Sequence, residues 1–255
     1  MNLLNNLQKE DIQSYPFPHI TKEDVLPSDL AGTLLKEYPP LELITKGGKK
    51  ENERYHFFAK EALPLVTPLW ESFILSHLTQ SYWDKFAELF NLPKLKVGIR
   101  GIDTFKNADV LLEVDVSVNT PTSRATSVRT AHTDDPHQIL TGLYYLRDDD
   151  SEGGDLELYK WNRKPLFHEK QFVERSMVDF VKPFPYKHNS LILFPNTINA
   201  LHGVSPRQPT KNYRYLVALA ADVKEPLFIQ PQESRYMRSF HYRAPLAYKI
   251  MRKLV

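Results

Sequence analysis

The sequence predicts a mainly β protein with helices at its N-terminal end, an α+β arrangement in which the strands form the larger part. From about residue 94, short apolar runs rich in Val, Ile, Leu and Tyr alternate with clusters of turn-forming residues. Up to about residue 92, the apolar residues instead recur at helical spacing. Many short strands at this spacing favour a sandwich or barrel over a parallel α/β sheet.

Three helices are expected near the N-terminus. Pro27 can open the first, because proline is tolerated at the first helical position, and the Tyr-Pro-Pro run at 38–40 ends it. The second begins at about Pro68. The third follows Ser81, which has Asp84 three residues later in a capping-box pattern.

The strands of the core are separated by polar turn clusters that contain Asn, Asp, Gly and Pro. The expected strands lie near residues 95–105, 109–118, 125–133, 138–147, 154–161, 173–182, 190–195, 201–206 and 212–223.

By this change in hydrophobic pattern, the chain divides into three parts of a single structural domain. Residues 1–92 are expected to form a helical region packed on the core, residues 93–224 the β core, and residues 225–255 a C-terminal extension. The Lys and Arg residues near the end, from about Pro245, indicate a short basic helix with a solvated face.

Composition excludes several classes of function. Hydrophobic residues make up 42% of the 255 residues, and the formal net charge of +2 does not suggest a dedicated nucleic-acid binder. The chain has no cysteine, so any metal must have nitrogen and oxygen ligands.

The first residues lack a signal-peptide pattern, and no run approaches the roughly 20 apolar residues of a membrane span. A cytoplasmic location without a membrane partner is therefore expected.

One short motif suggests a metal site. His132 and Asp134 are two positions apart, and on an extended chain both side chains point to the same side, whereas Asp135 points away. His202 follows later, after the apolar run 191–195. Two histidines and one carboxylate on one face of an ion are the arrangement of non-haem iron(II) oxygenases, which leaves positions for a chelating keto acid and for dioxygen.

A charged residue within the last apolar run adds to this pattern. Arg214 lies inside the run 213–221, where an unpaired buried guanidinium would be very costly. It can bind the distal carboxylate of a keto acid through paired hydrogen bonds. Arg207 is the competing candidate. Arg214 is preferred because it lies within the strand, whereas Arg207 lies in a proline-flanked turn.

These pieces carry a resemblance to a known family. Residues 125–223 resemble the double-stranded β-helix core, a jelly-roll or cupin-like fold, of the Fe(II)- and 2-oxoglutarate-dependent oxygenases, and most closely the prolyl-hydroxylase-like branch. The matching segments, in the order of the family, are 132–134, 141–146, 152–156, 190–195, and 202–206 followed by 213–215.

The resemblance implies that Fe(II) is the metal, 2-oxoglutarate the cosubstrate, and ascorbate an additional candidate cofactor. It implies hydroxylation of an unactivated C–H bond of a small molecule or of an amino-acid or peptidyl side chain by O2, with release of succinate and CO2. It also implies that Tyr145 contacts the cosubstrate beside Arg214. Arg129, His137 and Arg207 are further candidates for supporting the metal site or contacting the substrate.

Other interpretations remain open. Tyr145 can be a packed aromatic residue, Arg214 a structural ion-pair partner, and Gly153-Gly154 a simple hairpin turn. A catalytically silent jelly-roll binding module is an alternative function, although such a module would be expected to lack part of the His-Asp-His-Arg set. A nucleic-acid demethylase of the same superfamily is disfavoured because position 220, where that group usually has a second arginine, is Ala220.

Overall fold

The computed structural model describes residues 1–127, 129–234, 238 and 243–246. The basic helix expected from about Pro245 falls almost entirely on residues outside this part. Among the described residues, none of the helices combines the length and the apolar character that a bilayer span requires.

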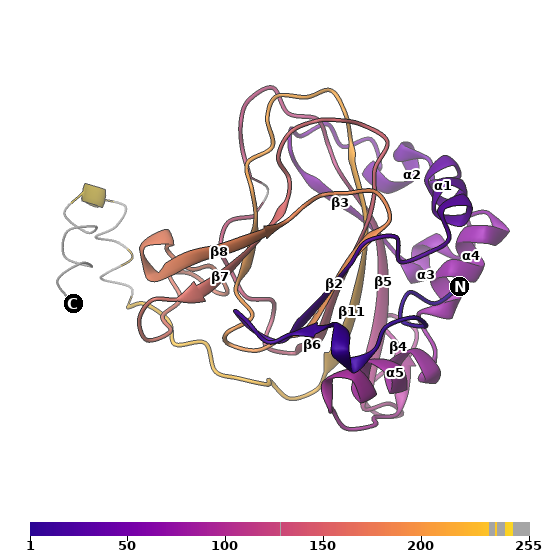
Figure 1. Cartoon of the computed structure of the whole chain (residues 1–255), viewed down its shortest axis with the longest axis horizontal. Coiled ribbons are helices and arrows are strands. Elements are labelled where there is room, and N and C mark those ends of the chain that lie inside the picture. The colour runs from indigo at the N-terminus through magenta and orange to yellow at the C-terminus, as the bar shows by residue number, and fades with distance from the viewer. Residues whose placement is uncertain (128, 235–237, 239–242, 247–255) are drawn as a thin grey trace.

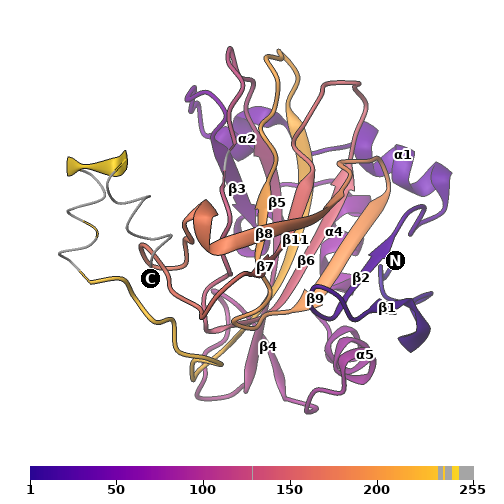
Figure 2. The same ribbon diagram turned by 60° about the vertical axis from the view of Figure 1, so that its left-hand side comes forward.

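Two largely antiparallel sheets face each other and form a jelly-roll core, so the predicted mainly β fold class is confirmed (Figures 1 and 2). The larger sheet has the order β1-β2-β9-β6-β11-β5-β3, with β4 paired to β5, and the smaller sheet has the order β10-β7-β8. The strands are β1 (Ile12–Gln13), β2 (His19–Lys22), β3 (Arg54–Phe58), β4 (Val97–Ile99), β5 (Val110–Asn119), β6 (Gln138–Leu146), β7 (Leu156–Trp161), β8 (Val178–Phe184), β9 (Ser190–Pro195), β10 (His202–Val204) and β11 (Arg214–Val223).

The three expected helices are present and lie on the outer face of the larger sheet, on the side away from β7 and β8 (Figure 1). The expected cap at Ser81 is wrong. Thr79 caps the third helix, because its Oγ accepts the backbone N–H of Tyr82 at 3.2 Å while Ser81 already lies in the first turn. The helices are α1 (Ser28–Lys36), α2 (Leu41–Thr45), α3 (Ala59–Ala62), α4 (Pro68–Ser76) and α5 (Gln80–Phe90), with the 3-10 helices η1 (Lys9–Asp11) and η2 (Arg175–Met177).

The N-terminal region also contributes strands, which its helical pattern did not predict. β2 pairs with β9, and β3 pairs with β5 at one edge of the larger sheet. Both partners lie far along the chain, so the pairing depends on tertiary context that local sequence does not show.

The expected strand at 125–133 is absent from the described residues. In its place are isolated bridges that join Thr126 to Arg207 and His132 to His202. Both bridges join the same two segments, 126–132 and 202–207, but among the described residues they stay isolated and form no continuous ladder. β8 also starts later than expected, because η2 precedes it.

Strand β5 separates two regions. On one side is the apolar core between the helices and the larger sheet, here called the helix-side core, and on the other is the space between the sheets. All ten of its residues are buried, and Val114, Val116 and Val118 pack in the helix-side core. Side chains alternate along a strand, so the intervening positions face the other sheet. These positions are polar and are Glu113, Asp115, Ser117 and Asn119.

Candidate functional site

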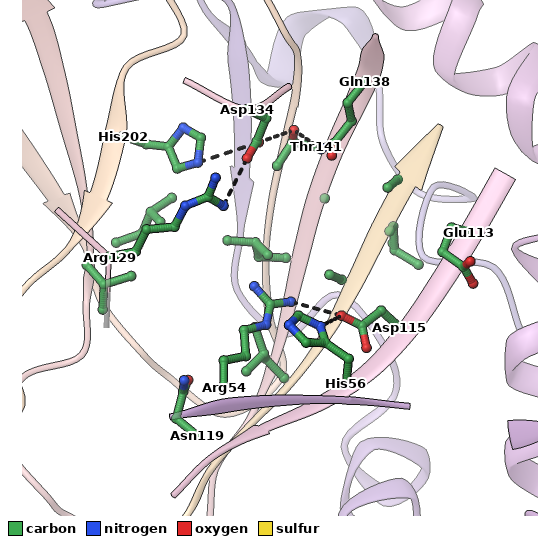
Figure 3. A pocket seen from close by; sticks show the side chains of 18 of the residues that line it. Arg54, His56, Glu113, Asp115, Asn119, Arg129, Asp134, Gln138, Thr141 and His202 are labelled. Atoms are coloured by element: carbon green, nitrogen blue, oxygen red, sulfur yellow. Dashed lines mark hydrogen bonds and ion pairs between the residues drawn. The ribbon is translucent and has the colours of Figure 1, made fainter. Parts of the chain in front are cut away.

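A cavity of about 450 Å³ lies between the two sheets (Figure 3). The inward-facing residues of β3, β5, β6 and β11 line one side, and residues of the segment 129–134 and of β10 line the other. The strand registers place Arg54, Asn119 and Arg214 opposite one another, so these side chains form one row across three neighbouring strands.

His132, Asp134 and His202 come together at one end of this cavity. All three are buried, and each offers one ligand atom within 4.8 Å of the others. His132 Nε2 lies 3.8 Å from Asp134 Oδ1, and His202 Nε2 lies 3.5 Å from Asp134 Oδ2. The backbones of His132 and His202 exchange two hydrogen bonds of 2.9 Å, which fixes the two segments side by side.

Backbone carbonyls set the orientation of both imidazole rings. Nδ1 of His132 lies 2.6 Å from the carbonyl oxygen of Thr130, and Nδ1 of His202 lies 3.0 Å from that of Ala200. With Nδ1 donating, the lone pair of each Nε2 is directed toward Asp134. His132 Nε2 is buried and finds no hydrogen-bond partner among the described residues.

The electrostatic environment favours the protonation states that bind a metal, which are neutral for the two histidines and ionised for Asp134. Burial lowers the pKa of both histidines, and for His132 the nearby His202 and Arg129 lower it further. Burial alone would raise the pKa of Asp134, but the nearby His202 and Arg129 outweigh it and hold that pKa well below its usual range. The site therefore contains neutral imidazoles and an ionised carboxylate at neutral pH.

Two neighbours hold the Asp134 carboxylate in place (Figure 3). Thr141 Oγ donates to Oδ2 at 2.7 Å, and Arg129 Nη1 lies 3.3 Å from Oδ1. Arg129 thus lies beside the cluster and lines the cavity. Asp135 is exposed and pairs instead with His137 at 2.9 Å, which places His137 outside the cavity lining.

Arg214 and Tyr145 form a second polar group in the cavity. The Arg214 guanidinium is buried between two rings, 4.7 Å from the centroid of Tyr145 and 4.8 Å from that of Tyr186, and donates to Asn119 Oδ1 at 3.2 Å. Within the described part of the chain, its Nε and Nη2 and the Tyr145 hydroxyl are buried without a hydrogen-bond partner. Burial raises the pKa of Tyr145, so the hydroxyl keeps its proton and can donate.

Arg207, which the sequence suggested as a residue that supports the metal site or contacts the substrate, is buried and lies outside the cavity lining. Its guanidinium donates to the carbonyl oxygens of Thr120 at 2.7 Å and Asn212 at 2.8 Å. These bonds join two loops, so Arg207 has a structural role in this arrangement.

The Gly153-Gly154 pair is not a hairpin turn, because it connects β6 in the larger sheet to β7 in the smaller sheet. Both glycines have positive φ angles, +78° and +83°. A Cβ on Gly153 would lie 2.1 Å from the carbonyl oxygen of Pro206, and one on Gly154 would lie 3.2 Å from Arg214 Nε. The glycines therefore permit close approach of this loop to the arginine.

The sequence interpretation missed a polar group on β3 and β5. Asp115 Oδ2 lies 2.6 Å from His56 Nδ1 and 3.3 Å from Arg54 Nη2, and its Oδ1 accepts the backbone N–H of Phe57 at 3.1 Å. Burial raises the pKa of Asp115, but His56 and Arg54 outweigh it and the net shift is downward. The polar residues at every second position of β5 were the available signal. Arg54 and His56 gave no such signal because β3 was not predicted.

The residues present fit Fe(II) and 2-oxoglutarate. Two neutral imidazoles and a carboxylate that converge on one position are the donor set of a non-haem iron(II) site. Such a site leaves coordination positions for other ligands. The unpaired donors of Arg214 and Tyr145 suit a carboxylate, because buried donors that lack an acceptor are costly.

Comparisons with known proteins agree with this geometry. Residues 122–220 match the family model described as the 2OG-Fe(II) oxygenase superfamily. No curated protein sequence matches the chain. Several solved structures share its fold at low identity.

A prolyl 4-hydroxylase from Phytophthora capsici has 16% identity and a TM-score of 0.56 over 97% of this chain and 74% of that one. The non-heme alpha ketoglutarate dependent carbocyclase SnoK from nogalamycin biosynthesis has 14% identity and a TM-score of 0.53 over 91% and 96%. The epimerase SnoN, in complex with Fe3+, alpha ketoglutarate and nogalamycin RO, has 10% identity and a TM-score of 0.50 over 83% and 82%.

At such identities the solved structures establish the fold alone, and the family follows from the match of residues 122–220. Fe(II) and 2-oxoglutarate are the cofactors that this family implies. Residues 122–220 are those of a 2OG-Fe(II) oxygenase, a 2-oxoglutarate- and Fe(II)-dependent dioxygenase, and the chain has the fold of the prolyl 4-hydroxylases.

Proposed function

We propose that this dioxygenase hydroxylates an unactivated C–H bond of a small molecule or of an amino-acid or peptidyl side chain. In this reaction O2 is the oxidant: one oxygen atom enters the product hydroxyl and the other enters succinate, which forms as 2-oxoglutarate loses CO2. The observation that carries the proposal is the convergence of three buried ligand atoms, within 4.8 Å of one another, in a cavity that also contains an arginine with unpaired donors.

His132, Asp134 and His202 would hold the metal. Both Nε2 atoms are directed to Asp134, and the lowered pKa values of the two histidines keep these atoms unprotonated. Thr141 and Arg129 position the carboxylate through its two oxygens. Such supporting contacts orient metal ligands and tune their affinity.

Arg214 and Tyr145 would bind the distal carboxylate of 2-oxoglutarate. Nε and Nη2 of Arg214 form a planar fork that matches the two oxygens of a carboxylate. The rings of Tyr145 and Tyr186 and the amide of Asn119 keep the guanidinium in one orientation, so little conformational freedom is lost on binding.

Fe(II) and 2-oxoglutarate supply the oxidising chemistry when they are bound, and the chain supplies binding and positioning. Between the metal ligands and Arg214, the cavity wall is apolar and is formed by Leu143, Leu156, Val204 and Leu216. These side chains exclude water from the space in which substrate and cosubstrate meet, which limits side reactions.

Metal content and succinate release test this proposal. After anaerobic reconstitution, the chain should bind one Fe(II), and succinate release should require both Fe(II) and 2-oxoglutarate. His132→Ala should abolish both properties. His137→Ala is the matched control, because His137 is exposed and pairs with Asp135. A chain that takes up no Fe(II) would contradict the metal assignment and favour a silent binding module.

The type of product needs a separate measurement. Two of the solved structures with this fold carry the descriptions carbocyclase and epimerase, so the fold does not by itself favour hydroxylation. Candidate small molecules and peptides should be screened by succinate yield, and each product weighed by mass spectrometry. A gain of one oxygen atom is expected. An unchanged mass, or a loss of two hydrogens, would contradict hydroxylation while leaving the family assignment intact.

A further inference from the structure

Arg54 points into the cavity from the edge strand β3, on the wall away from the metal ligands (Figure 3). Its Nη2 lies 3.3 Å from Asp115 Oδ2 and 3.4 Å from Ser117 Oγ. Its Nε is buried and meets no hydrogen-bond partner among the residues that the structure describes. Asp115 and Ser117 therefore hold Arg54 through Nη2, while Nε can donate to a ligand.

A second guanidinium, that of Arg129, faces the same space from the metal side (Figure 3). Arg54 and Arg129 line the same cavity, and Arg54 also lies in one row with Asn119 and Arg214 across β3, β5 and β11. Two like charges that face one space repel each other, and an anion bound between them would remove this repulsion.

The charges of the loaded site leave room for one more anion. The two positive charges of Fe(II) and the one of Arg214 balance the two carboxylates of 2-oxoglutarate and the one of Asp134. Asp115 then balances only one of the two remaining guanidinium groups, those of Arg54 and Arg129.

The other charged residues of the wall change this balance little. Arg100 pairs with Asp222 at 2.9 Å, and Glu53 is exposed to solvent. Glu113 accepts the backbone N–H of Ala59, and burial raises its pKa to about 7, so it offsets the excess positive charge only in part at neutral pH.

We propose that Arg54 anchors the primary substrate and that this substrate is a small carboxylic acid, with its carboxylate held between Arg54 and Arg129. The inference rests on the proposed function of the same site. A cavity of about 450 Å³ lies in the lower part of the range for small-ligand sites, roughly 300–1,000 Å³, and must also hold 2-oxoglutarate. The space that remains suits a compact acid. Asp115 is a positioning residue, because it holds both Arg54 and His56.

Calorimetric titration of the chain loaded anaerobically with Fe(II) and 2-oxoglutarate tests this inference without turnover. The probes are N-acetyl amino acids and simple carboxylic acids, each compared with its own carboxamide. At least one acid should bind roughly 10- to 100-fold more tightly than its amide, the difference expected for a charge-assisted hydrogen bond.

Variants assign this preference to one residue. Arg54→Gln should remove the difference between acid and amide, and Arg54→Lys should restore part of it. Arg100→Gln is the matched control, because it removes the same charge from the same wall but from an arginine paired with Asp222. It should keep the preference. Circular dichroism should show that each variant is folded.

Three results would overturn the inference. One is a loaded wild-type chain that binds no acid more tightly than its amide. Another is equal loss of the preference in Arg54→Gln and Arg100→Gln. The third is a loss of 2-oxoglutarate affinity in Arg54→Gln as large as that in Arg214→Gln, which would assign Arg54 to the cosubstrate. In the first two cases retained binding of Fe(II) and 2-oxoglutarate would leave the proposed function standing, whereas loss of both in the wild type would reject the function itself.

Discussion

Replacement of Arg214 by glutamine should weaken 2-oxoglutarate binding by roughly 100- to 1,000-fold. The buried Nε and Nη2 donors are available for a carboxylate, and a hydrogen bond to a charged group contributes about 1.5–3 kcal/mol. Two such bonds contribute about 3–6 kcal/mol, or about two to four powers of ten in Kd at 1.4 kcal/mol per tenfold. The lower half of this range is expected, because glutamine keeps one donor and the two bonds of a fork are not additive.

The assay is calorimetric titration of the Fe(II)-loaded chain with 2-oxoglutarate under anaerobic conditions. Arg207→Gln is the matched control, because its guanidinium is buried nearby but donates to the carbonyls of Thr120 and Asn212. It should lower the free energy of unfolding by about 1–3 kcal/mol, since it leaves buried carbonyls without donors. Its Kd for 2-oxoglutarate should change by less than about threefold. A larger loss of affinity in Arg207→Gln than in Arg214→Gln would refute the assignment of Arg214.

Three further predictions concern the metal, the pH dependence and the glycine loop. Thr141→Val should weaken Fe(II) binding by about 10- to 100-fold, because Asp134 loses a 2.7 Å hydrogen bond; an unchanged metal titration would contradict this. His77 is buried in the helix-side core and its pKa is lowered from 6.5 to about 4, so below pH 6.5 only the unfolded chain takes up this proton. Stability in urea should therefore fall by up to about 3 kcal/mol between pH 6.5 and pH 4, and His77→Phe should flatten this slope, whereas an equal slope in both chains would exclude His77 as the cause. Gly153→Ala should lower the free energy of unfolding by roughly 1–3 kcal/mol, since φ is +78° and the new Cβ would lie 2.1 Å from the Pro206 carbonyl oxygen; an unchanged denaturation midpoint would argue against this close approach.

The core strands were predictable because each buries a continuous apolar face. β6 is rich in Leu, Ile and Tyr and β9 in Leu, Ile and Phe, each between turn clusters, and this local composition determines them. The short strands β2 and β3 were not predictable in this way. β2 pairs with β9, and the edge strand β3 pairs with β5, so both depend on residues more than fifty positions away.

The wrong interpretation of Gly153-Gly154 and the unforeseen burial of Arg207 have a common cause. Gly153-Gly154 has the composition of a hairpin turn, and Arg207 lies next to Pro206, which suggested a turn. In the folded chain the glycine loop connects two sheets and packs on Pro206, while Arg207 is buried and joins two loops. In both cases, contacts between distant segments determine the role.

The sequence by itself determined the mainly β class, the spacing of the His-Asp-His set, and the choice of Asp134 over Asp135, because side-chain alternation and donor chemistry are local properties. Only the tertiary structure placed His132 beside His202, left donors of Arg214 available within the cavity, and brought Arg54 of β3 into the same wall. Strand pairing joins segments that local interactions cannot position, so the composition of the cavity wall was decided by the register of the sheet.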